Sequence, residues 1–124
     1  MTPEQRLAAI RSHVAQRPDD PFARYSLAMA LRSAGDRAGA VAEFRELVRR
    51  LPDYVPTYLM LGQVLEEEGR AEEALRAFQD GAVVARRTGD GHAERELAGA
   101  AEAVVLPGTG EAGPPVPIAG GKAP

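Results

Sequence analysis

Two segments of this chain, residues 21–54 and 55–88, align with each other at an offset of 34 residues. Five positions are identical in this alignment: Leu27 and Leu61, Leu31 and Leu65, Gly35 and Gly69, Ala40 and Ala74, and Phe44 and Phe78. Each segment therefore has two leucines one helical turn apart, then a glycine, and then an alanine four residues before a phenylalanine. A period of this length predicts stacked supersecondary units, because one such unit cannot bury its apolar face alone.

Glycine and proline divide residues 1–105 into six expected helices, in which apolar residues recur at three- and four-residue spacing. Thr2, Pro3 and Gln5 predict a capping box at the start of the first helix, and Asp20 and Asp36 are expected to cap the next two. The expected ranges, closing glycines included, are 3–17, 21–35, 37–50, 56–69, 71–87 and 92–105. The expected inner faces are Ala40, Val41, Phe44 and Val48 in the third helix, and Leu97, Ala101 and Val104 in the sixth. No strand is expected.

The second segment resembles the tetratricopeptide-repeat family, whose repeats carry an aromatic residue, Leu-Gly, Tyr, and later Ala-x-x-x-Phe and Pro. The matching residues are Tyr58, Leu61, Gly62, Ala74 and Phe78. Leu65 stands in place of the second aromatic residue and Arg86 in place of the closing proline. Since no proline ends the fifth helix, we expect it to be longer than the third.

The first segment is similar to the same family. It matches at Leu27, Ala28, Leu31, Ala40, Phe44 and Pro52, whereas Arg24 occupies the position of the opening aromatic residue. Ile10 and Pro18 lie 34 residues before Phe44 and Pro52, so the first helix looks like the second half of a worn repeat. The sixth helix looks like the start of a further repeat.

The resemblance implies an all-α fold: a right-handed superhelical stack of antiparallel helix hairpins, with about six helices. We expect one helical domain over 1–105, with repeats at 21–54 and 55–88, an N-terminal helix at 3–17 and a C-terminal capping helix at 92–105. Residues 106–124 are rich in proline and glycine and are expected to form a flexible tail. Pro114, Pro115 and Pro117 could attract a proline-binding module, but an inert tail or linker is the favoured interpretation.

The resemblance also implies a concave groove, lined by the first helix of each hairpin, that holds a partner peptide or helix. The predicted groove residues are Phe22, Tyr25, Met29, Arg32, Leu59, Gln63 and Glu66. The alternative interpretation is that the apolar members of this set belong to the core. Members of the family that clamp a C-terminal carboxylate place lysine and asparagine on these helices, whereas Arg32 is the only cation in the predicted set. We therefore expect no strong binding to acidic C-terminal chaperone tails.

These observations favour a protein-binding adaptor, scaffold or co-chaperone-like module. The alternative is a structural subunit that self-associates, because two full repeats fall short of the roughly three usually needed for a stable solenoid. A third possibility is a scaffold domain whose tail links it to an effector. The sequence leaves the identity of the protein or peptide partner open.

Composition excludes several other functions. The net charge of −3 offers no basic excess for nucleic acid, and the absence of cysteine removes disulfides, thiolate ligands and a cysteine nucleophile. No signal peptide or membrane span is visible, so a cytoplasmic protein without membrane contact is expected. His13 and His92 are far apart, and Glu66–Glu68 with Glu72 and Glu73 form a charged corner that we expect to be solvated. We therefore predict no catalytic residues, no metal and no cofactor.

Overall fold

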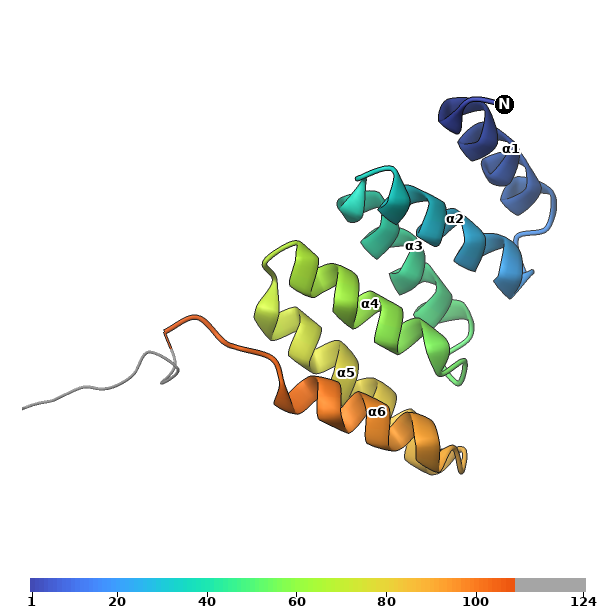
Figure 1. The fold of residues 1–124 in the computed structure, drawn as a ribbon. Coiled ribbons are helices and arrows are strands. Elements are labelled where there is room, and N and C mark those ends of the chain that lie inside the picture. The colour runs from blue at the N-terminus through green and yellow to red at the C-terminus, as the bar shows by residue number, and fades with distance from the viewer. Residues whose placement is uncertain (109–124) are drawn as a thin grey trace, which may run out of the picture.

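The computed structural model describes residues 1–108, and within them it contains six helices and no strand (Figure 1). The helices are α1 (Pro3–Gln16), α2 (Pro21–Ser33), α3 (Arg37–Arg50), α4 (Pro56–Glu67), α5 (Ala71–Arg87) and α6 (Gly91–Glu102). Each helix packs mainly against the next one in the sequence, from α1 at one end of the stack to α6 at the other. The predicted all-α stack of helix hairpins is confirmed.

Short side chains begin the first three helices as predicted. The Thr2 hydroxyl accepts a hydrogen bond from the Gln5 backbone N–H at 3.1 Å, and the Gln5 side chain accepts one from the Thr2 N–H at 2.8 Å. The carboxylates of Asp20 and Asp36 accept bonds from backbone N–H groups in the first turns of α2 and α3. These bonds satisfy donors that the helix itself leaves unpaired, so each helix begins at a defined residue.

The turns within the two repeats depend on glycine. Gly35 and Gly69 have φ values of 87° and 76°, a region that residues with a β-carbon rarely adopt. The following residue in each turn donates its N–H back to the last turn of the helix: Asp36 to the Leu31 carbonyl and Arg70 to the Leu65 carbonyl, both at 2.9 Å. This bond closes the helix and reverses the chain.

The helix ends depart slightly from the expected ranges. The helices α2 and α4 end before their closing glycines, at Ser33 and Glu67. The helix α6 begins at Gly91, where residue 92 was expected, and it ends at Glu102, three residues short of the expected 105. The prediction that the fifth helix is longer than the third is confirmed, since α5 has 17 residues and α3 has 14.

The core is one continuous cluster running through the stack. Its largest fully buried apolar side chains are Phe44, Phe78, Leu31, Leu47, Leu65, Leu97 and Val64. Ala40 and Ala74 are fully buried, and their small side chains let adjacent helices approach closely. Leu47, which was not predicted, is the buried residue near the end of α3, while the predicted Val48 is only partly buried against this core.

The departure of the first repeat from the family pattern has a structural explanation. Arg24 occupies the aromatic position, and its guanidinium donates to the Glu43 carboxylate of α3 at 2.8 Å. Both side chains are largely buried, with exposures of 12% and 22%. An ion pair therefore joins α2 to α3 at the position where an aromatic side chain was expected.

No helix within residues 1–108 is both long enough and apolar enough to span a bilayer.

Candidate functional site

A hollow of about 160 Å³ lies where the first helices of successive hairpins meet, and we call it the inner hollow. It is lined by Tyr25 of α2, by Val55, Pro56, Leu59 and Met60 at the start of α4, and by Asp90, Ala93, Glu96 and Leu97 at the start of α6. An apolar cavity of roughly 150 Å³ accommodates a benzene-sized group. The inner hollow is therefore large enough for one apolar side chain of a partner.

Tyr25 forms one wall of the inner hollow and is held in place by two aromatic neighbours. Its ring packs edge-to-face against Phe44 at a centroid distance of 5.7 Å and against Tyr54 at 6.4 Å. Burial, followed by the influence of Tyr54, raises the pKa of the Tyr25 hydroxyl above its ordinary value. Tyr25 is therefore neutral near pH 7 and presents a fixed, amphipathic surface.

The structure brings two of the predicted groove residues together in the inner hollow, namely Tyr25 and Leu59. Tyr25, Met29 and Leu59 are all partly buried against the core, so the alternative interpretation of these residues as core holds in part for all three. Phe22 is 70% exposed and borders a different hollow, between α1 and α2. On α4, Gln63 is half-buried and Glu66 is exposed, and neither lines the inner hollow.

Arg32, the predicted cation of the groove, is already paired. Its Nε donates to Glu67 Oε1 at 3.1 Å, and a second guanidinium nitrogen donates to the other carboxylate oxygen. The hydrogen bond from Arg32 is the main reason that the pKa of Glu67 lies below its ordinary value. Arg32 also contacts the sulfur of Met60 at 3.8 Å. Its observed role is to tie α2 to α4, beside the inner hollow.

Sequence reasoning missed the contribution of α6. Ala93, Glu96 and Leu97 belong to the inner hollow, although no residue of the sixth helix was assigned to the groove. The 34-residue frame places Ala93 in register with Tyr25 and Leu59, but the sixth helix lacks the motif residues of the family and was therefore expected only to cap the stack. A usable signal was the Thr88-Gly89-Asp90 sequence, which resembles Ala34-Gly35-Asp36 and predicts a tight turn between stacked helices.

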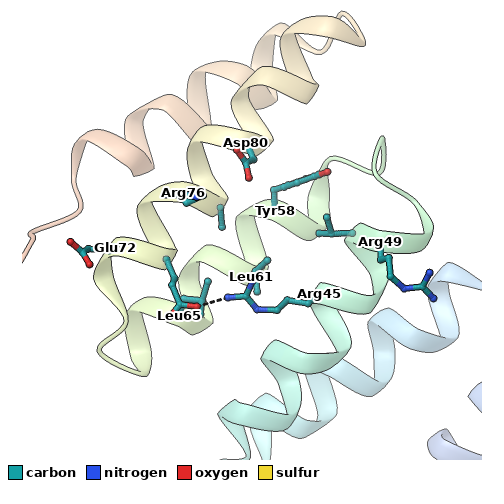
Figure 2. Close-up of a pocket in the computed structure, with 11 residues that line it drawn as sticks. Arg45, Arg49, Tyr58, Leu61, Leu65, Glu72, Arg76 and Asp80 are labelled. Atoms are coloured by element: carbon teal, nitrogen blue, oxygen red, sulfur yellow. Dashed lines mark hydrogen bonds and ion pairs between the residues drawn. The ribbon is translucent and has the colours of Figure 1, made fainter.

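A larger hollow, of about 580 Å³, lies between α3, α4 and α5, and we call it the outer hollow (Figure 2). Its floor includes Tyr58, Leu61 and Leu65, and the Tyr58 hydroxyl donates to the Pro52 carbonyl. Its rim has three arginines (Arg45, Arg49 and Arg76) and three carboxylates (Glu72, Glu73 and Asp80). Arg45 crosses from α3 to Glu73 of α5 in an ion pair of 2.6 Å. The three arginines and three carboxylates therefore balance one another, and the rim has no excess of either charge.

Within residues 1–108, no three histidine, aspartate or glutamate side chains are grouped as metal ligands. His13 lies 3.8 Å from Asp20, and His92 is exposed. In the charged corner, Glu67 pairs with Arg32, while Glu73 accepts hydrogen bonds from Arg45 and Arg70.

Comparison with known proteins identifies the family. The tetratricopeptide-repeat family model matches residues 6–55 and 25–93, so the chain belongs to this family. Proteins of this family are generally interaction modules rather than catalysts. No match was found among curated proteins.

Solved structures support the same conclusion. The chain is similar to a tetratricopeptide-repeat domain protein from Salinibacter ruber, with 39% identity and a TM-score of 0.66 over 68% of this chain and 86% of the other. It is also similar in fold to the TPR2B domain of yeast Sti1, solved in a complex with pHsp70, with 17% identity and a TM-score of 0.70 over 77% of each chain. A third similar fold is that of MamA, with 15% identity and a TM-score of 0.59 over 80% of this chain and 62% of the other.

Proposed function

We propose that this chain acts as an adaptor, scaffold or co-chaperone-like subunit that binds a partner segment across α2, α4 and α6. Its family supports a protein–protein interaction module in general. The observation that carries the location is the inner hollow, because three successive first helices contribute to it and Tyr25 and Leu59 meet α6 there. Aromatic, leucine and methionine side chains around a concave site are typical of a surface that receives an apolar group.

In this proposal the predicted groove residues have unequal roles. Tyr25 and Leu59 contact the partner's apolar group, and Met60 extends this surface. Gln63 and Glu66 lie further along α4 and contact the chain that follows that group. Arg32 fixes the spacing of α2 and α4 through Glu67, and Phe22 lies beyond the edge of the contact.

The test is a selection of random 12-residue peptides on the full chain, followed by binding measurements on variants. The substitutions Tyr25→Asp and Leu59→Asp should abolish binding of the selected peptides. Because Tyr25 packs against the buried Phe44, Tyr25→Asp also strains the core. Ala93→Arg is a second variant, which places a long charged side chain at the α6 wall.

Val83→Ser on α5 is the matched control, since Val83 is 65% exposed and does not line the inner hollow. We expect helicity by circular dichroism to be unchanged in Ala93→Arg and Val83→Ser, and peptide binding to be lost only in the former. If binding survives both Leu59→Asp and Ala93→Arg, or if no peptide is selected, the proposed site is wrong.

A second candidate is self-association, favoured by the exposed surface at the end of the stack. Val105 is 60% exposed just after α6, and Ala98, Gly99 and Ala103 are exposed as well. A second copy would cover this surface. Light scattering after size exclusion of the full chain, at several concentrations, should then show a dimer that Val105→Asp converts to a monomer. A monomer throughout, or a dimer unchanged by Val105→Asp, removes this candidate.

A further inference from the structure

The two hollows differ in the charge that surrounds them. The outer hollow has three arginines opposite three carboxylates. The inner hollow is lined by Asp90 and Glu96, and none of its lining residues is basic. A partner that enters the inner hollow therefore meets negative charge beside an apolar wall.

The two carboxylates of the inner hollow are not equivalent. Asp90 is the N-cap of α6, and its side chain accepts a hydrogen bond from the Ala93 backbone N–H at 3.0 Å. Its charge is partly offset by the positive end of the helix dipole. Glu96 lies in the middle of α6, is exposed, and forms no ion pair within residues 1–108. Glu96 is thus the carboxylate that is free to pair with a cation from outside.

The two arginines at the Glu67 end of this face are paired within the protein. Arg32 is bound to Glu67, and the Arg37 guanidinium lies 3.6 Å from the same carboxylate. Glu66, further along α4, is exposed and also without an ion pair in the described part of the chain. The surface that runs from α6 along α4 therefore keeps unpaired carboxylates, while the two arginines beside Glu67 are already occupied. Arg95 is exposed on α6 but does not line the inner hollow.

We propose that the inner hollow selects a protein segment in which one apolar side chain enters the hollow and a nearby lysine or arginine pairs with Glu96. This inference rests on the proposed function, and it names the chemistry of the partner. An exposed ion pair contributes modestly to affinity, so the apolar group supplies most of the binding free energy. The charge supplies selectivity and a faster, salt-sensitive association.

The first readout is the composition of peptides selected from a random 12-residue library on the full chain. Selected peptides should share an apolar residue with lysine or arginine nearby. Replacing that cation with glutamine should weaken binding about 2–5-fold, as expected for an exposed pair, and replacement with glutamate should weaken it further. Raising the salt concentration from 50 mM to 500 mM should reduce the preference, because the Debye length falls below about 5 Å.

The second readout separates a local pair from the overall negative charge of the chain. Glu96→Arg should reverse the preference, so that the glutamate peptide binds better than the lysine peptide. Glu102→Arg is the matched control, because it changes the net charge equally on the same helix but lies outside the inner hollow. The lysine preference should persist in this control. An unchanged preference in Glu96→Arg, or an equal loss in both variants, overturns the inference.

Leu59→Asp distinguishes the two levels of the proposal. If selected peptides lose binding in Leu59→Asp but show no charge preference, the site stands and only the inference about Glu96 fails. If they still bind Leu59→Asp and Ala93→Arg, they bind elsewhere, and the proposed function fails together with the inference.

Discussion

Gly62 of α4 packs directly against the Phe78 ring of α5, and the substitution Gly62→Ala adds one methyl group there. An added β-carbon would lie 2.5 Å from Cδ1 and 2.6 Å from Cζ of the Phe78 ring. Carbon atoms are in favourable contact at about 3.5–4.0 Å, so the ring or the helix must move. Phe78 is only 1% exposed and has no adjacent solvent into which to move.

Two effects of opposite sign determine the result of Gly62→Ala. Alanine is favoured over glycine inside a helix by about 0.5–1 kcal/mol. Overpacking a close-packed core costs about 1–3 kcal/mol. Because the added atom would meet a buried ring, we take the upper part of that cost and expect a net loss of about 1–2.5 kcal/mol in the free energy of unfolding, and a Tm lower by about 4–8 °C for each kcal/mol.

Gly99→Ala on α6 is the matched control, since an added β-carbon at Gly99 would meet nothing within 4 Å. In Gly99→Ala only the higher helix propensity of alanine acts, so we expect the free energy of unfolding to rise by about 0.5–1 kcal/mol. Urea and thermal unfolding followed by circular dichroism would measure both variants. If Gly62→Ala is neutral, or stabilises as Gly99→Ala does, Phe78 is not fixed as described and the reasoning is refuted.

Three further predictions concern individual polar groups. Thr57 is fully buried, and its hydroxyl has no hydrogen-bond partner in the described residues. Thr57→Val should therefore raise the free energy of unfolding by about 1 kcal/mol. A lower urea midpoint in Thr57→Val than in the wild type would contradict this. The pKa of Glu46 is lowered from 4.5 to about 2 by hydrogen bonds from Arg49 and Arg50, so this carboxylate stabilises the fold above pH 4.5, and its contribution is lost as the pH falls through about 2. As the pH falls from 4.5 to about 2, the urea midpoint should therefore fall less steeply in Glu46→Gln than in the wild type. The same pH dependence of the midpoint in both proteins would exclude the effect. Glu67→Gln should lower the free energy of unfolding by about 0.5–1 kcal/mol at low salt and by less at high salt. A loss of stability that does not depend on salt would show that the charge of Glu67 is not the cause.

The helices could be predicted from the sequence because their signals are local. Thr2, Asp20 and Asp36 begin helices through bonds to N–H groups two or three residues away. Gly35 and Gly69 adopt the backbone conformation that their residue type favours. Such bonds depend on a few consecutive residues, so a repeated pattern suffices to predict them.

The candidate site was predicted less completely because it depends on contacts between distant residues. The family resemblance placed Phe22 with Tyr25 and Leu59, but it could not show which side of α2 is next to α1 and which is next to α4. It could not show that Glu67, 35 positions away, accepts the hydrogen bonds of Arg32. The contribution of α6 depends on its packing beside α4, and the sixth helix has none of the motif residues that would have pointed to it.

The predicted tail falls largely outside the described residues. The proline cluster Pro114, Pro115 and Pro117 lies in 109–124, so its suggested role as a linker or a ligand of a proline-binding module stays a prediction.

The most direct test of the central claim is to map a bound peptide on the full chain by NMR. Backbone amide shifts would be followed while a selected 12-residue peptide is added to the isotope-labelled protein. The largest changes are expected at four residues that line the inner hollow, namely Leu59, Met60, Ala93 and Glu96. Changes that cluster instead at Arg49, Arg76 and Asp80, around the outer hollow, would contradict it.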